Sequence, residues 1–333
     1  MDEHVVEMRL VEFIHERRAS FPTKVIRQQF GETMLALVAE RPNLVALTAD
    51  LMHPTGMLDF AKAYPERFFN VGIAEQNMTG IAAGLASCGK LPVVCGYAAF
   101  TTLRAVEQAK LDCGYNGVKV ILVGQSAGLS YGVGGPTHQA LEDVAIMRAI
   151  PNMIVVTPSD ALEVDAALRA CIANPAATPI YLRLGRGPEP VFNTAALDFE
   201  IGKASTLHMG DDLSIVANGS MAFEALLAAD ALAQEGIAAQ VLNMHTVKPF
   251  DKAAILDAAA RVRGMITVEE HSLIGGLGSA VLEALEDGHS IPVRRIGVKD
   301  IYPPIGPTSE LRAALGLSAQ NILRVALDLM KRS

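Results

Sequence analysis

The feature that most constrains the fold is a regular alternation of short apolar runs with longer helical patterns, from Phe21 to about Phe192. Runs of this length, rich in Val, Ile, Leu and Ala, are typical of parallel strands covered by helices on both faces. We expect strands at Leu44–Ala49, Val93–Gly96, Val118–Val123, Met153–Thr157 and Pro179–Leu184. The helices expected between them are Gln29–Glu40, Glu75–Cys88, Thr102–Cys113, Gln139–Ala149 and Ala161–Ala173. This order predicts a doubly wound α/β domain.

Pro188, Pro190 and Asn193 interrupt the alternation, and a second α/β pattern begins at Leu213. Strands are expected there at Leu213–Ala217, Ala239–Asn243 and Gly264–Glu269, with helices at Ala222–Glu235, at Lys252–Val262 and after Ile274–Ser279. A chain of 333 residues suits two cores, because single cores stop growing at about 250 to 300 residues. We therefore predict an N-terminal helical segment at 1–20 and two doubly wound domains with mainly parallel sheets, at 21–195 and 196–333.

Composition excludes several classes of protein. Charged residues through the first twenty positions rule out the apolar core of a signal peptide, and every long apolar stretch is interrupted before the roughly 18 residues of a membrane span. The four cysteines show neither Cys-x-x-Cys spacing nor a disulfide-dense pattern, so we expect a reducing cytoplasm and no structural zinc. A net charge of -8 without a basic run argues against nucleic acid as a partner.

A glycine-rich turn at Ile274–Ser279 precedes a predicted helix, the position in which backbone amides can bind a phosphate. Its spacing is Gly-Gly-x-Gly, whereas a dinucleotide site has Gly-x-Gly-x-x-Gly. We interpret these glycines as serving turn geometry or close packing.

Glu75 is the first candidate for chemistry. By position alone it could be a first-turn glutamate that stabilises the helix dipole. However, Phe69–Met78 resembles the corresponding segment of transketolases and of deoxyxylulose-phosphate synthases. That resemblance implies thiamine diphosphate as cofactor. It makes Glu75 the carboxyl group that favours the imino tautomer of the aminopyrimidine, whose nitrogen then removes the proton from the thiazolium carbon.

Other segments extend the resemblance. Tyr97 and Phe100 end a predicted strand, where transketolases have a similar aromatic pair against the cofactor ring, followed by an arginine, here Arg104. Asp50 and Leu51 resemble a segment that transketolases place beside the cofactor. Without the resemblance, core filling would remain the weaker alternative for this pair, because aromatic residues make up only 5% of the chain.

Gly132–Gln139 looks like the transketolase loop that ends in Gly-Pro-Thr-His-Gln, which implies that His138 faces the reacting carbons; taken alone, it would be a helix-cap residue. Arg27 and Arg186 fall near two arginines that transketolases use for the substrate's phosphate, although either could be a solvated side chain. Two positions depart from the family, because Gly134 aligns with a common Asp and Ser126 with a common phosphate-contacting His. We expect altered sugar specificity, with Ser126 at the substrate site.

The Gly-Asp-Gly and Asn-Asn elements with which transketolases hold Mg²⁺ and diphosphate are absent from the sequence. The resemblance covers the C-terminal two thirds of a transketolase, so we expect an N-terminal diphosphate-binding partner subunit, which would hold the Mg²⁺, and two copies of each chain. The expected activity is transfer of a two-carbon ketol unit from a ketose to an aldose. Alternatives are the beta subunit of a 2-oxoacid dehydrogenase, a deoxyxylulose-phosphate-synthase-like enzyme, or a scaffold without activity.

Overall fold

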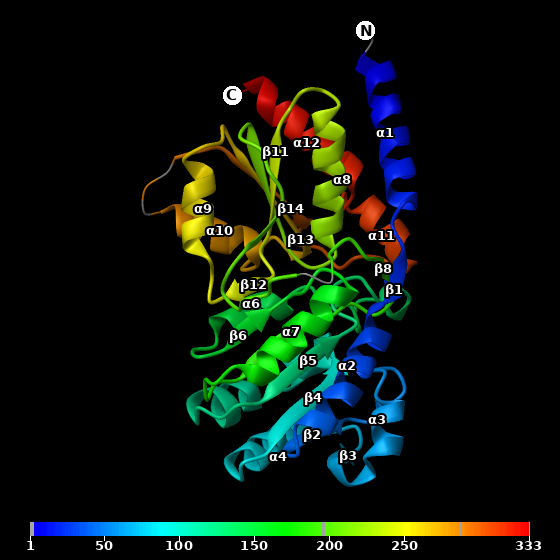
Figure 1. Cartoon of the computed structure of the whole chain (residues 1–333), viewed down its shortest axis with the longest axis vertical. Helices are drawn as coiled ribbons and strands as arrows, with labels where there is room; N and C mark the ends of the chain where they lie inside the picture. The colour runs from blue at the N-terminus through cyan, green and yellow to red at the C-terminus, as the bar shows by residue number, and fades with distance from the viewer. Residues whose placement is uncertain (1–2, 195–196, 287, 289, 333) are drawn as a thin grey trace.

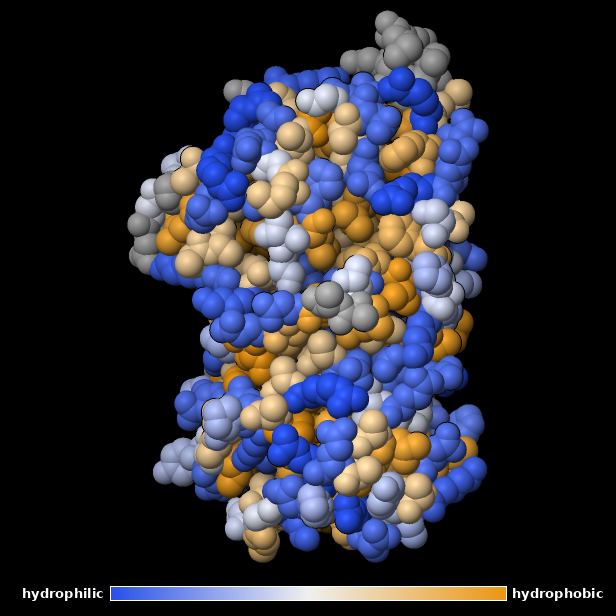
Figure 2. All heavy atoms as spheres, in the orientation of Figure 1, coloured by the Kyte–Doolittle hydropathy of each residue, from blue (hydrophilic) through white to orange (hydrophobic). Residues whose placement is uncertain are grey.

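The computed structural model describes residues 3–194, 197–286, 288 and 290–332. The two larger sheets lie one above the other along the long axis of the molecule, each with helices against it (Figure 1). Hydrophobic residues show around the waist where the two units meet, among hydrophilic ones (Figure 2). Both sheets are mainly parallel, which confirms the predicted α/β fold class.

The first sheet has seven strands in the order β12-β6-β7-β5-β4-β2-β3. Its parallel strands are β2 (Leu44–Thr48), β3 (Phe68–Asn70), β4 (Leu91–Tyr97), β5 (Ile121–Gln125), β6 (Ile154–Val156) and β7 (Ile180–Arg183). Alternate strand residues face opposite sides, and both sides are apolar. One side packs on α2 (Ile26–Glu40), α3 (Leu58–Ala63) and α7 (Ala161–Ala173), the other on α4 (Glu75–Ser87) and α6 (Asp143–Ala149).

The helix expected at Thr102–Cys113 is not a regular α-helix. Two π-helical stretches, Phe100–Arg104 and Ala109–Tyr115, flank a short α5 (Val106–Gln108). The hydroxyls of Thr101 and Thr102 donate to the carbonyls of Tyr97 and Ala98, both at 2.6 Å, and so compete with the regular backbone pattern. Such π-bulges often occur at functional sites. The following helix also differs from expectation, since α6 begins only at Asp143.

The second sheet has the order β14-β13-β10-β11-β9, with only the edge strand β9 antiparallel. Its strands are β9 (Ser205–His208), β10 (Leu213–Ala217), β11 (Ala239–Asn243), β13 (Met265–Ser272) and β14 (Val293–Val298). The helices of this unit are α8 (Met221–Ala233), α9 (Lys252–Ala259), α10 (Leu277–Leu285), α11 (Thr308–Ala314) and α12 (Ala319–Arg332).

The N-terminal helix α1 (Glu3–Ala19) stands beside α8 in Figure 1. Leu10 and Ile14 are buried in the core of the second sheet. Arg18 adds a two-pronged ion pair to Glu224 of α8, at 2.9 and 2.6 Å. The start of the chain therefore packs on the unit that lies farthest from it in sequence.

Two further strand pairings join segments that are far apart in the sequence. β1 (Thr23–Val25) pairs antiparallel with β8 (Pro188–Pro190), and Lys24 lies opposite Glu189. β12 (Thr246–Lys248) leaves the second half of the chain and joins the edge of the first sheet, antiparallel to β6. No helix among the described residues is long and apolar enough to cross a bilayer.

Candidate active site

The candidate residues follow the carboxyl ends of neighbouring strands of the first sheet. Glu75 comes after β3, Asp50 after β2, Tyr97 ends β4, and Ser126 directly follows β5. These strands are parallel neighbours, so their carboxyl ends meet at one edge, where α/β sheets bind ligands.

Glu75 is the first residue of α4 and its side chain is buried. Arg104, about half exposed, donates from Nη1 to Glu75 Oε2 at 2.8 Å. The guanidinium also lies 4.4 Å from the centre of the Phe100 ring. The π-helical turn after β4 thus brings Arg104 over both the carboxylate and the aromatic ring.

An aromatic cluster continues from Phe100. The His138 ring lies 5.3 Å from Phe100, 6.0 Å from Tyr97 and 5.3 Å from Tyr131, always edge to face. The Thr137 hydroxyl is 2.9 Å from His138 Nδ1, which helps to fix the imidazole. His138 is therefore held among three rings, with the Thr137 hydroxyl at its Nδ1.

Arg186 connects this cluster to an open hollow of about 430 Å³. Its Nη1 donates to the Tyr97 hydroxyl at 2.9 Å, and its guanidinium stacks on the Tyr131 ring at 4.0 Å. Arg27 and Tyr131 line the same hollow. The remaining lining residues are Val25, Ser130, Gly132, Val133, Gly187, Pro188, Pro307 and Thr308. We call this the two-arginine hollow; its positive charge and hydroxyl groups suit an anionic ligand.

Contacts run without a break from Glu75 to the two-arginine hollow: Glu75 to Arg104, Arg104 to Phe100, Phe100 to His138, His138 to Tyr131, and Tyr131 to Arg186. The motifs of the sequence do not point to Tyr131. The signal was present, since aromatic residues make up only 5% of the chain and Tyr131 directly precedes the glycine-rich loop.

Asp50 and Leu51 lie at the end of β2, farther toward the edge of the sheet. Asp50 has a positive φ of 60°, and its N–H donates to Asn70 Oδ1 at 3.0 Å. The Leu51 N–H donates to Thr48 Oγ1 at 3.2 Å. Left-handed backbone at a non-glycine residue is costly and is concentrated at functional sites.

Ser126 also has a positive φ, of 57°, but its side chain is fully buried. Within the part of the chain that the structure describes, its hydroxyl has no hydrogen-bond partner. Ser126 does not line the two-arginine hollow, whereas Ser130 does.

The glycine-rich loop packs closely against its surroundings. A Cβ on Gly134 would lie 2.9 Å from His138 Cβ and 3.1 Å from Tyr131 Cδ1. A Cβ on Gly132 would lie 2.4 Å from the Gly306 carbonyl oxygen. Gly134 is therefore a steric requirement for the packing of His138 on Tyr131.

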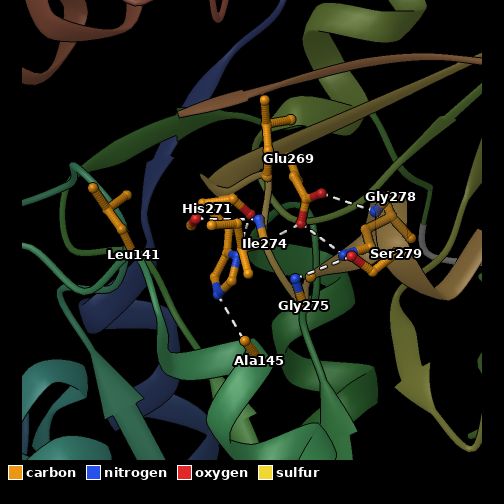
Figure 3. A network of polar contacts seen from close by, with 12 residues as sticks. Leu141, Ala145, Glu269, His271, Ile274, Gly275, Gly278 and Ser279 are labelled. Carbon is orange, nitrogen blue, oxygen red and sulfur yellow. Dashed lines mark hydrogen bonds and ion pairs between the residues drawn. The ribbon is translucent and has the colours of Figure 1, made fainter. Parts of the chain in front are cut away.

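The second glycine-rich turn, before α10, binds a carboxylate of this chain (Figure 3). Glu269 accepts from the N–H groups of Leu277 and Gly278, at 2.6 and 2.8 Å. A Cβ on Gly276 would lie 2.0 Å from Glu269 Oε2. These glycines thus serve close packing, and an internal anion occupies the helix N-terminus.

Two family descriptions match the chain. "Transketolase, pyrimidine binding domain" matches residues 23–189 and "Transketolase, C-terminal domain" matches residues 202–322. The chain belongs to the transketolase family.

Two relatives of this transketolase-family chain are named as transketolase subunits. It is 41% identical over 307 residues to a 6-deoxy-6-sulfo-D-fructose transketolase subunit of Clostridium sp., covering 92% of this chain and 95% of the relative. It is 40% identical to an apulose-4-phosphate transketolase subunit of Phocaeicola vulgatus, covering 92% and 97%. A solved structure of a split gene transketolase, an inactive beta4 tetramer, superposes with a TM-score of 0.85 at 39% identity, covering 92% and 98%.

These matches confirm the predicted membership and identify the chain as a transferase subunit of the transketolase type. They favour this interpretation over the beta subunit of a 2-oxoacid dehydrogenase. Deoxyxylulose-phosphate synthases are similar too, but the chain spans only 46–48% of their length, so that alternative is weaker. The family implies thiamine diphosphate as cofactor. Among the described residues, no group of three His, Cys, Asp or Glu side chains could hold a metal.

Proposed function

We propose that this chain is one half of a thiamine diphosphate-dependent transketolase that moves a two-carbon ketol unit between sugars carrying an anionic group. The observation that carries the proposal is the continuous series of contacts from Glu75 through His138 to the two-arginine hollow. A carboxyl group, an imidazole and an anion site in this order fit a sugar whose carbonyl end faces the cofactor and whose anionic end faces the arginines.

The residues present fit the cofactor. Tyr97 and Phe100 offer aromatic surface 6.1 Å apart at the end of β4, and Leu51 offers a further apolar wall beside Asp50. When bound, thiamine diphosphate supplies a nucleophilic thiazolium carbon. Glu75 exchanges a proton with a ring nitrogen of the aminopyrimidine. Arg104 donates to Glu75 Oε2, so Oε1 would be the carboxyl oxygen available to the aminopyrimidine.

His138 binds a substrate oxygen and exchanges a proton with it. Its ring is held by Tyr97, Phe100 and Tyr131, so the imidazole keeps one orientation while substrates change. Arg27 and Arg186 bind the anionic end of the sugar. Arginine suits this role because its planar fork binds phosphate or sulfonate oxygens in pairs.

The substrate anion is a phosphate or a sulfonate. One similar protein is named for a sulfonated fructose and another for apulose 4-phosphate, so the same fold serves both groups. Ser126 is not an anion ligand in this proposal, because its hydroxyl is buried away from the hollow. Ser130 and Thr308, which line the hollow, donate hydrogen bonds from their hydroxyl groups to the anion instead.

The diphosphate and its Mg²⁺ bind mainly to an N-terminal partner subunit, with two copies of each chain. A close subunit contact around α4 is supported by five exposed apolar side chains, which lie in the loop before α4, on α4, and on the two π-helical stretches that contact it: Ile73, Ile81, Leu103, Leu111 and Tyr115. Gly84 of α4 allows near approach of another backbone, because a Cβ there would meet no atom of this chain within 4 Å. We place the complex in the cytoplasm and the division between the two domains near residues 190–205.

Glu75→Gln tests the proposal. The amide has a similar size but cannot relay a proton, so ketol transfer by the complex with its diphosphate-binding partner should fall by about 10²-fold or more. Exchange of the thiazolium proton into heavy water measures the affected step. Glu66→Gln is the matched control, because it makes the same change at an exposed glutamate that pairs with Arg67, outside the series of contacts. Normal exchange in Glu75→Gln would refute the role of Glu75.

A further inference from the structure

Arg312 of α11 lies outside the two-arginine hollow, and it pairs with Glu189 and Glu270, two residues that do not line the hollow but connect to opposite walls of it. Its side chain is 15% exposed, and its charge is balanced by Glu189 and Glu270, which are 12% and 4% exposed. It donates to Glu189 with both terminal nitrogens, at 2.8 and 3.3 Å, and to Glu270 Oε2 with Nε. The Ser220 hydroxyl accepts a further bond at 2.8 Å. This guanidinium therefore has few degrees of freedom.

The Glu270 contact leads to the wall that carries Tyr131. The other carboxylate oxygen of Glu270 accepts from the Leu129 N–H at 2.7 Å. The Leu129 carbonyl accepts from the Thr308 hydroxyl at 3.0 Å, and Thr308 is one turn before Arg312 on α11. Gly128 permits this approach, because a Cβ there would lie 2.4 Å from Glu270 Oε1. Both backbone groups of Leu129 are thus fixed from the second unit, two residues before Tyr131.

The Glu189 contact leads to the wall that carries the two arginines. Glu189 is the middle residue of β8, three positions after Arg186. β8 pairs with β1, with Val25 opposite Pro188, and the Ile26 N–H donates to the Gly187 carbonyl at 3.0 Å. This ribbon brings Arg27 and Arg186 to one rim of the hollow. A shift of Glu189 would move both.

Building on the proposed function, we propose that Arg312 is a positioning residue for the substrate's anionic group. By holding Glu189 and Glu270 together, it fixes the distance between the arginine wall and the Tyr131 wall. Glu75 lies at the other end of the site, and no described contact links it directly to Arg312. Loss of Arg312 should therefore weaken binding of the anion and leave activation of the cofactor intact.

Arg312→Met in the complex with the partner subunit tests this. Misplacement by about 1 Å can cost on the order of 10²-fold. We expect the KM for xylulose 5-phosphate, with ribose 5-phosphate as acceptor, to rise by about ten-fold or more. Broadening of the phosphorus resonance of inorganic phosphate, measured at equal complex concentration, should fall in parallel. Exchange of the thiazolium proton should stay within about two-fold of the unmutated complex.

Arg324→Met is the matched control, since Arg324 is an exposed arginine of the second unit that donates to Asn321 Oδ1, within its own helix, at 2.7 Å. Arg312→Lys should restore part of the phosphate binding, because lysine keeps the charge but not the two-pronged geometry. If Arg312→Met does not fold, Glu189→Gln gives the same test, because it weakens the arginine-wall contact without changing size.

Unchanged phosphate broadening in Arg312→Met, or in Glu189→Gln when the first variant does not fold, would overturn the inference. An equal loss of proton exchange and phosphate binding would also overturn it, because it would mean general damage to the site. Absence of proton exchange in the unmutated complex would instead reject the proposed function. The phosphate measurement needs no turnover and still decides the role of Arg312 in that case.

Discussion

Gly134 offers a sharp test of how the glycine-rich loop positions His138. The perturbation is Gly134→Ala, which adds a single methyl group. Its carbon would lie 2.9 Å from His138 Cβ, 3.0 Å from His138 Cγ and 3.1 Å from Tyr131 Cδ1. All three contacts are to the cluster that holds the imidazole, so the strain falls on the proposed substrate site.

The size of the effect follows from these distances. Non-bonded carbons are comfortable at about 3.5–4.0 Å, so the loop or the ring must move by at least about 0.5 Å. Overpacking of this kind costs about 1–3 kcal/mol. Because displacement by about 1 Å can lower a rate on the order of 10²-fold, we expect kcat/KM to fall by about ten-fold. Gly134→Asp should be worse, because its side chain adds a larger, charged group at the same position.

The assay compares kcat/KM for ketol transfer with exchange of the thiazolium proton, both in the complex with the partner subunit. Transfer should fall while exchange is retained, because Glu75 is separated from Gly134 by Arg104, Phe100 and His138. Gly185→Ala is the control, because a Cβ there meets no atom within 4 Å and the residue lies beside Arg186. If Gly134→Ala transfers as fast as Gly185→Ala, His138 is not positioned in this way.

Two further outcomes are expected. Burial raises the pKa of Glu163 from 4.5 to about 7, although Ser159 and Asn243 donate to its carboxylate. The folded state therefore binds this proton more tightly, and stability of up to about 3 kcal/mol is lost as pH rises from 4.5 to above 7. Urea unfolding from pH 5 to 8 should show this loss, and Glu163→Gln should lack it; equal pH dependence in both would contradict the assignment. A Cβ on Gly84 of α4 meets no atom of this chain within 4 Å, so Gly84→Leu should leave the isolated chain stable but prevent assembly with the partner on a sizing column; normal assembly would show that α4 is not at the contact.

Local patterns predicted the parts of the fold that local sequence determines. The structure has α7 at Ala161–Ala173 and β10 at Leu213–Ala217, as expected. Capping and turn residues mark the ends of both segments in the sequence. Asp160, for example, caps α7 by accepting from the Glu163 N–H at 2.9 Å. The π-helical turns after Phe100 could not be predicted, since they depend on which carbonyls the threonine hydroxyls reach in the folded state.

In the candidate site, too, local motifs predicted some residues and only the folded structure reveals others. Short motifs pointed to Glu75, Tyr97 and His138, and the structure brings the last two into contact and links the first to them through Arg104 and Phe100. Arg312 carries no local signal, because its partners Glu189 and Glu270 come from distant strands. Positions that act through long-range ion pairs become visible only when the topology is known.

β12 has a consequence for how the chain can be divided. This strand of the second half supplies one edge of the first sheet, and Lys248 donates to the carbonyls of Arg148 and Ile150 at 2.9 and 2.6 Å. A fragment that stops near residue 205 would leave β6 as an open edge, a template for pairing with other chains. Cutting the chain at the linker between the units would therefore not yield a complete first unit. The ribosome makes β12 only after the first strands of the second sheet, so the first sheet can be completed only while the second unit is forming.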